Sequence, residues 1–168
     1  YIQVVADTSG EYAYQIRSSG VSGVDLVASD VTVSRQMVSP GTDFRVSGGV
    51  ENRRGDIAND VSVDIFVAAD TGDYENGIRI GGSTIDQVGG AATTPFSVRL
   101  TMPSDSDLSA IGLSIPTNAY VIVVVDQQRQ IADSQFANNV SSALIALENE
   151  CIDDDPNSNE GQSTSTSL

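Results

Sequence analysis

The sequence lacks histidine, lysine and tryptophan and contains a single cysteine. Histidine is the usual general base of serine and cysteine hydrolases, so its absence excludes hydrolases that use such a base. Histidine is also a common zinc and copper ligand, so zinc and copper sites that depend on an imidazole ligand are excluded too. The absence of lysine also excludes Schiff-base enzymes and Ser-Lys dyads. Tyrosine and paired carboxylates, as glycosidases use, remain as catalytic groups, but no sequence pattern places two carboxylates in one cleft. We therefore expect no enzyme active site in this chain.

Positive charge is also scarce. The eight basic residues are all arginines, against 23 acidic residues, and the formal net charge is −15. Nucleic acid and anionic membranes are therefore poor partners, because phosphate-binding surfaces need concentrated positive charge. The longest apolar stretch, residues 119–125, is too short to cross a bilayer, so we expect no membrane insertion. The single Cys151 cannot form an internal disulfide, so cysteine usage does not indicate whether the protein works in an oxidising or a reducing compartment.

The sequence does contain a succession of short alternating apolar runs, separated by Gly, Pro, Asn and Asp. The expected strands are residues 26–33, 44–50, 61–67, 78–85, 96–102, 120–125 and 140–147. Gly81-Gly82 predicts a bend or bulge at a sheet edge, and the most apolar run, 120–125, predicts a central strand. One short helical turn is expected around residues 108–111. About seven strands at this spacing favour an all-β, immunoglobulin-like sandwich of two antiparallel sheets over a barrel.

The two ends of the chain differ in composition from this body. Runs 2–5 and 12–16 flank a turn-rich segment and predict a hairpin, which a Ser/Gly linker follows. After Leu147 the chain becomes acidic and then Ser/Thr-rich, and such a segment buries too little apolar area to offset its chain entropy. We therefore divide the chain into three parts. Residues 1–23 form a hairpin and linker, which can be the end of a preceding β domain; 24–147 form the sandwich; and 148–168 form an acidic linker or disordered tail.

Several short motifs stand in a characteristic order within residues 24–147. They are Asp25-Leu26-Val27, Val31-Thr32-Val33, Ser39-Pro40-Gly41, Val50-Glu51-Asn52 with Gly55, Val63-Asp64-Ile65-Phe66, Asp70, Val125-Asp126 and Asn138-Asn139. Together they resemble the bacterial cell-adhesion-related domain called CARDB. The resemblance implies an immunoglobulin-like module of extracellular, multi-domain bacterial and archaeal proteins, often beside hydrolases or other β modules. The family commonly carries acidic residues around its Asn-Asn pair, whereas residues 132–137 here read ADSQFA, which puts an acidic function of that turn in doubt.

The flanks show a second, shorter resemblance. Residues 10–16 are similar to the last strand of a bacterial pre-peptidase C-terminal domain, and residues 151–160 are similar to the acidic opening of another. Because the chain opens at Tyr1 rather than at Met, we interpret it as a fragment or mature product of a longer protein. These features together predict a string of β modules.

The resemblance implies a non-catalytic adhesion or spacer module in a multi-domain surface or secreted protein, extracellular or at the cell surface. One alternative is an accessory domain of a secreted hydrolase, such as a peptidase. Another is a self-associating subunit of a surface array or filament. The expected partners are neighbouring domains of the same protein and a protein or surface ligand whose identity the sequence does not give.

One loop carries oxygen donors of the kind that calcium prefers. Residues 70–77 include Asp70, Asp73 and Glu75, and calcium takes about six to eight hard oxygen ligands. We therefore name calcium as the candidate metal at these three residues and expect no other cofactor. The spacing is not that of an EF-hand, and a solvated acidic hairpin loop is the alternative. Weaker candidates are Asp105 with Asp107, and residues 153–155.

Two further motifs have a structural interpretation. Arg54-Gly55-Asp56 spells the tripeptide that integrins recognise in adhesive proteins, but it falls in a predicted loop where Gly55 is already expected as a turn residue. Asn138-Asn139 precedes the last predicted strand, where asparagine can hydrogen-bond to nearby backbone. We expect both motifs to shape loops rather than bind a partner.

Overall fold

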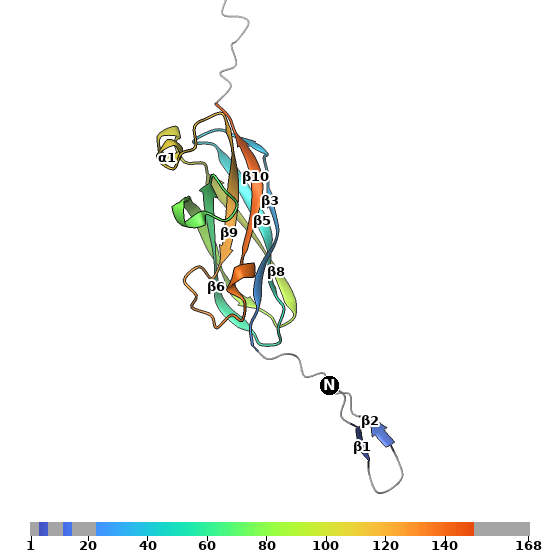
Figure 1. Ribbon diagram of the computed structural model, residues 1–168. Helices are drawn as coiled ribbons and strands as arrows, with labels where there is room; N and C mark the ends of the chain where they lie inside the picture. The colour runs from blue at the N-terminus through green and yellow to red at the C-terminus, as the bar shows by residue number, and fades with distance from the viewer. Residues whose placement is uncertain (1–3, 7–11, 15–22, 150–168) are drawn as a thin grey trace, which may run out of the picture.

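The structure, a computed structural model, describes residues 4–6, 12–14 and 23–149. Near the N-terminus, β1 (Val4–Ala6) and β2 (Tyr12–Tyr14) pair antiparallel, with Val5 opposite Ala13 (Figure 1). The two paired strands overlap the two apolar runs from which a hairpin was predicted. The resemblance to a pre-peptidase domain at residues 151–160, and most of that at residues 10–16, falls outside the described residues.

Two sheets form the body of the molecule (Figure 1). One has five strands in the order β4-β10-β9-β6-β7, and the other has three in the order β3-β5-β8. All neighbouring strands are antiparallel except β4 and β10, which are parallel. The predicted all-β sandwich is confirmed. Its strands are β3 (Leu26–Val33), β4 (Met37–Val38), β5 (Asp43–Asn52), β6 (Ala58–Ala68), β7 (Ile78–Val88), β8 (Ala92–Thr101), β9 (Thr117–Val125) and β10 (Val140–Leu147).

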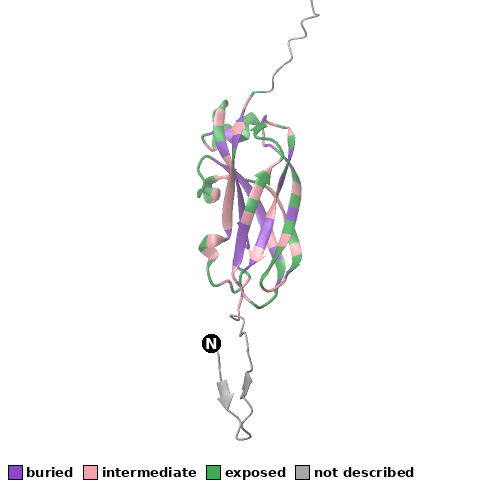
Figure 2. Ribbon diagram, turned by 90° about the vertical axis from the view of Figure 1, so that its right-hand side faces the viewer, coloured by how far each residue is buried: buried purple, intermediate pink, exposed green. Residues whose placement is uncertain are grey.

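The main core lies between the two sheets. Alternate residues of each strand point inward, as the period-two pattern predicts, and stacking the sheets removes both apolar rows from water at about 25 cal/mol per Å² of apolar area. The inward row of β6 is fully buried, as is that of β9 at the centre of the larger sheet. In Figure 2 the buried positions run along the strands through the body. The largest fully buried side chains of the protein include Leu26, Ile65, Met102, Leu108 and Ile145.

A second apolar cluster covers the outer face of the five-stranded sheet. Phe66 and Ala68 of β6 pack there beside Ile122 and Val124 of β9. Two short 3-10 helices cover this cluster, η1 (Tyr74–Asn76) after β6 and η2 (Phe136–Asn138) before β10. Phe66, on the outward face of β6, is therefore buried.

Some boundaries differ from the prediction for identifiable reasons. Strand β4 was missed because two residues cannot display a hydrophobic period. The helical turn is α1 (Asp105–Ala110), which begins three residues before the expected turn because Ser104 caps it and accepts the Asp107 N–H. It is the one α-helix in the part of the chain that the structure describes, and no helix there is long and apolar enough to span a membrane.

Three edge strands carry irregularities. β7 is an edge strand, as predicted, and its register with β6 shifts between Ile65 and Phe66, opposite the glycine pair. In β3 the register shifts between Ser29 and Thr32, and Asp30 there has a φ of 51°. The edge strand β8 contains a proline, Pro95, which has no N–H to offer.

The chain enters and leaves the sandwich at opposite poles (Figure 1). At the N-terminal pole, Val24 forms a bridge with Asp133, whose carboxylate accepts the Leu26 N–H at 3.1 Å. At the C-terminal pole, the Glu148 N–H donates to the Val38 carbonyl at 3.2 Å, where β10 ends beside β4. The long axis of the body therefore runs from the incoming to the outgoing chain.

Replacing Val123 by Asp places an unpaired charge in the middle of β9, where Val123 is fully buried. An uncompensated buried charge costs about 3–5 kcal/mol or more, which is comparable to the whole stability of a typical domain. We expect no folded population by circular dichroism or by the dispersion of amide NMR signals. Thr84→Asp, at an exposed position of β7, is the control and should fold. A soluble Val123→Asp variant with unchanged melting temperature would contradict the strand placement.

Candidate functional site

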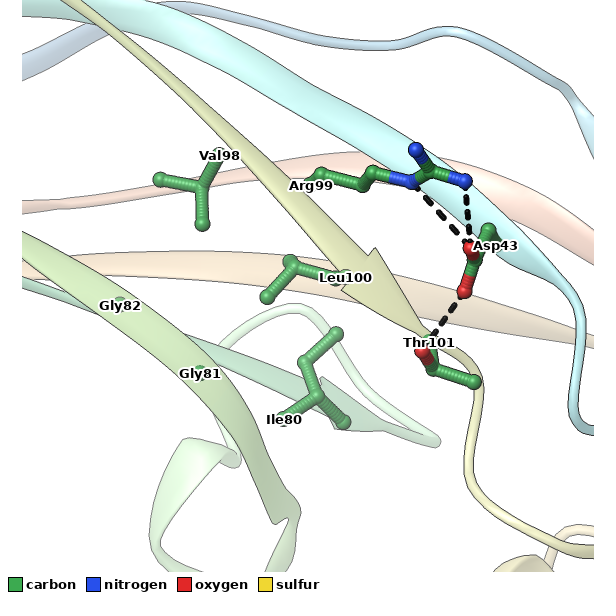
Figure 3. A pocket seen from close by; sticks show the side chains of 8 residues that line it. All are labelled: Asp43, Ile80, Gly81, Gly82, Val98, Arg99, Leu100 and Thr101. Carbon is green, nitrogen blue, oxygen red and sulfur yellow. Dashed lines mark hydrogen bonds and ion pairs between the residues drawn. The ribbon is translucent and has the colours of Figure 1, made fainter.

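A groove lies on the surface where the two sheets part. β7 and β8 follow one another in the chain, joined by the turn at residues 89–91, yet they belong to different sheets. Because no ladder joins them, the two edges diverge and leave a groove of about 510 Å³. Its lining comes from β7, β8 and the start of β5 (Figure 3): Asp43, Ile80, Gly81, Gly82, Val98, Arg99, Leu100 and Thr101.

Glycine shapes the wall of this groove. Gly81 has a φ of +153°, and a Cβ there would lie 2.4 Å from Cδ2 of Leu100 on the facing strand. The missing side chain therefore lets Leu100 pack against the backbone of β7, and Leu100 is only 6% exposed. A Cβ on Gly82 would lie 2.3 Å from the Val63 carbonyl oxygen. The predicted glycine bulge thus permits the close approach of β7 to its neighbours.

The rim of the groove is polar. Arg99 donates to Oδ2 of Asp43 through Nη2 at 2.7 Å and through Nε at 3.2 Å, and the Thr101 hydroxyl donates to Oδ1 at 2.7 Å (Figure 3). The hydroxyl of Thr101, together with the Arg99 guanidinium, holds the pKa of Asp43 below its usual value. An apolar floor with a paired cation and anion at its rim suits contact with another chain or a polar ligand.

The motif residues at the N-terminal pole shape its loops. Oδ1 of the buried Asn52 accepts the backbone N–H groups of Asp25 and Arg54, and its amide donates to the Asp56 carbonyl at 2.7 Å. The carboxylate of Asp126, which is 2% exposed, accepts the N–H groups of residues 130 and 131 at 2.9 Å each. These side chains replace the backbone partners that the loops cannot provide.

Asn138 and Asn139 take part in the same network. Nδ2 of Asn138 donates to the Asp25 carboxylate at 2.9 Å, and Nδ2 of the fully buried Asn139 donates to the Val125 carbonyl at 3.2 Å. Both amides therefore hold together segments of this pole that are distant in the sequence.

The Arg54-Gly55-Asp56 tripeptide is also part of this pole. The Asp56 carboxylate accepts the Gly23 N–H at 2.6 Å, and the Arg54 carbonyl accepts the Ala91 N–H at 2.7 Å. A Cβ on Gly90 would lie 2.1 Å from the Gly55 carbonyl oxygen, so two loops cross there closely. The tripeptide holds the chain where it enters the sandwich, as expected for a turn.

The acidic loop between β6 and β7 folds over the second apolar cluster. Asp73 accepts the Asn76 amide at 2.8 Å, and the Tyr74 ring lies 5.7 Å from that of Phe66. Asp70 and Glu75 are exposed. Within residues 23–149 and the two described N-terminal strands, no group of three or more Asp, Glu, His or Cys side chains is arranged to hold a metal ion. Calcium binding by Asp70, Asp73 and Glu75 stays a prediction.

The two weaker acidic candidates have different surroundings. Asp107 accepts the Ser104 hydroxyl at 2.5 Å and, with Asp105, lies in the first turn of α1, where carboxylates stabilise a helix. Residues 153–155 lie outside the described residues.

The groove residues Asp43, Arg99 and Thr101 were not predicted from the sequence. The available signal was the glycine pair, which predicted an irregular edge without indicating what would face it. Asp43 and Thr101 are 58 positions apart and meet only through the register of β5 and β8.

Replacing Thr101 by Val should raise the pKa of Asp43 toward its usual value, because the hydroxyl that stabilises the carboxylate is lost. Since the folded state lowers this pKa, Asp43 contributes stability above its unfolded pKa, and the contribution is lost as the pH falls through the folded pKa. Titration of the Asp43 carboxyl ¹³C shift measures the change. Thr84→Val, at an exposed position of β7, is the control. Identical titration of Asp43 in the wild type and Thr101→Val would contradict the assignment.

The calcium prediction is tested by thermal melting. Binding to the folded state alone raises the melting temperature, so millimolar calcium should stabilise the wild type and not an Asp70→Asn/Asp73→Asn variant. The matched control is Asp105→Asn/Asp107→Asn, which removes the same charge at α1 and should keep the shift. Absence of any shift in the wild type would remove calcium as a ligand of this loop.

No protein-family model and no curated protein matches the sequence. Among solved structures, a CARDB domain from Pyrococcus furiosus in complex with di-metal ions has 14% identity and a TM-score of 0.55, covering 76% of this chain and 96% of that one. A domain of a proposed cell surface protein from Methanosarcina acetivorans has 19% identity and a TM-score of 0.51, covering 75% and 93%.

A β-glucosidase from Erythrobacter marinus contains a similar region, with 16% identity and a TM-score of 0.50, covering 74% of this chain but 15% of that one. Similarity at this level of identity defines the fold. The sandwich and these neighbours together show that the chain has the CARDB fold that its motifs predicted.

Proposed function

We propose that this chain is a non-catalytic adhesion or spacer module of a longer, multi-domain protein, located outside the cell or at its surface. The observation that carries the proposal is the placement of the incoming and outgoing chain at opposite poles of the sandwich (Figure 1). A module built in this way adds its full length to a string of domains. The similar fold in a proposed cell surface protein of Methanosarcina acetivorans supports the location.

The strand order suits a module under tension. β3 leads the incoming chain away from the N-terminal pole, residues 34–36 cross to the other sheet, and β4 then pairs parallel to β10. Ala146 donates to the Gln36 carbonyl at 2.7 Å, and Glu148 donates to the Val38 carbonyl at 3.2 Å. When the two ends are pulled apart, β3 and β10 are each loaded along their own axis. The hydrogen bonds on both strands then share the load instead of breaking one after another.

A second function also has support from a specific observation. The β-glucosidase of Erythrobacter marinus carries a similar sandwich as 15% of its chain, so this fold also occurs within a hydrolase. An accessory domain that positions a catalytic neighbour or its substrate would use the open groove at β7 and β8. The self-associating alternative draws support from Met37 and Leu144, which are 62% and 53% exposed beside one groove.

Single-molecule pulling tests the spacer function. In a Cys151→Ser background, handles at the two chain ends load the sandwich from pole to pole. In an Asn118→Cys variant of that background, handles at residue 118 and at the C-terminus pull on the paired ends of the antiparallel strands β9 and β10 and peel β10 from β9 at one pole. We expect a higher unfolding force in the pole-to-pole geometry, because the bonds there are loaded together.

Equal unfolding forces in the two geometries would contradict a load-bearing role. Light scattering provides an independent check on the third alternative, since a monomer at high protein concentration excludes self-association as the function.

A further inference from the structure

Three of the eight arginines lie together on the outer face of the three-stranded sheet. Arg35 follows β3, Arg45 lies on β5 and Arg99 lies on β8, and all three are exposed. They line a shallow groove of about 260 Å³ with Ser34, Asp43 and Phe44. We call Arg35, Arg45 and Arg99 the arginine patch. Its three cations face one carboxylate, although the whole chain carries a net charge of −15.

The arginine patch is not neutralised by its own surroundings. Arg45 and Arg99 are direct cross-strand partners, and like charges in this position repel each other. Arg99 is paired with Asp43, whereas the guanidinium of Arg45 donates to the Ser97 hydroxyl, at 3.3 Å. Among the described residues, neither Arg35 nor Arg45 forms a salt bridge. An anion placed across the patch would relieve this repulsion.

The chain itself supplies such an anion next to the patch. Residues 148–155 contain five carboxylates in eight positions: Glu148, Glu150, Asp153, Asp154 and Asp155. The segment begins at the pole that carries the patch, because Glu148 is bonded to Val38, three residues after Arg35. Seven residues beyond Glu148 span roughly 23 Å when extended, enough to cross the neighbouring strands.

We propose that the acidic segment, residues 148–155, docks on the arginine patch of the same chain and so fixes the direction in which the chain leaves the sandwich. This rests on the proposed spacer function and deepens it, because a docked exit segment sets the angle of the next module. Each exposed ion pair is weak, but tethering gives the segment a high local concentration at the patch. Exposed charges are screened over about 10 Å at 0.1 M salt, so the docking is sensitive to salt.

The single cysteine allows a direct test in the full chain. A nitroxide on Cys151 broadens the NMR signals of amides close to it, and reduction of the nitroxide restores them. At low salt we expect loss of intensity for the amides of Arg45, Ser97 and Arg99. The amides of Ala68 and Ile78, at the same pole but on the other sheet, should keep their intensity. High salt should abolish the difference.

Two matched double variants identify the contact. Arg45→Ser/Arg99→Ser should lose the broadening. Arg53→Ser/Arg79→Ser removes the same charge at two positions outside the arginine patch, where each arginine is ion-paired, and should retain the broadening. Amide spectra show whether each variant is folded. Absence of broadening in the wild type, or equal broadening in both variants, overturns the proposal.

A mixed sample separates docking within one chain from docking between copies. Chains without ¹⁵N labelling that carry the nitroxide are mixed with ¹⁵N-labelled chains that carry no nitroxide. Broadening in this mixture assigns the patch to the acidic segment of a second copy and overturns docking within the chain. The pulling experiment is independent of the patch, so failure of docking and failure of the spacer function are distinguishable.

Discussion

The burial of β9 on both faces is the constraint on which the rest of the structure depends. One row of its side chains faces the three-stranded sheet, and Ile122 and Val124 face outward beside Phe66 and beneath the two 3-10 helices. A strand buried in this way must lie at the centre of its sheet, with β6 and β10 on either side. The loops after β6 and before β10 are therefore drawn over the outer face. The acidic loop that carries Asp73 is held there as a cover.

The polar side chains around this core differ between the two poles of the sandwich. At the N-terminal pole, the side chains of Asn52, Asp126 and Asn139 replace missing backbone partners and hold crossing loops together. Near the opposite pole, the exposed cations Arg35, Arg45 and Arg99 gather. One pole thus holds the incoming chain by hydrogen bonds, and the other presents positive charge to the segment that follows the sandwich.

The sequence predicted the body of the fold because apolar and polar residues alternate with a period of two wherever one face of a strand is buried. The predicted limits of β3 and β10 match the structure, and the edge position of β7 was readable from its glycine pair. The arginine patch and the groove were not predictable. Both depend on register, which places Arg45 opposite Arg99 and Asp43 opposite Thr101. Turn lengths alone could not show that β7 and β8, neighbours in the chain, would join different sheets.

The irregular edges have a consequence for assemblies of many modules. Edge strands with free backbone groups invite neighbouring molecules to add a strand, which leads to swapping and aggregation. Here the bulge at Asp30 interrupts β3, the glycine pair bends β7, and Pro95 lacks a donor on β8. Identical sandwiches crowded in tandem on one polypeptide would find no long straight edge to share. Each copy can then fold as a separate unit at the very high local concentration that such a string imposes.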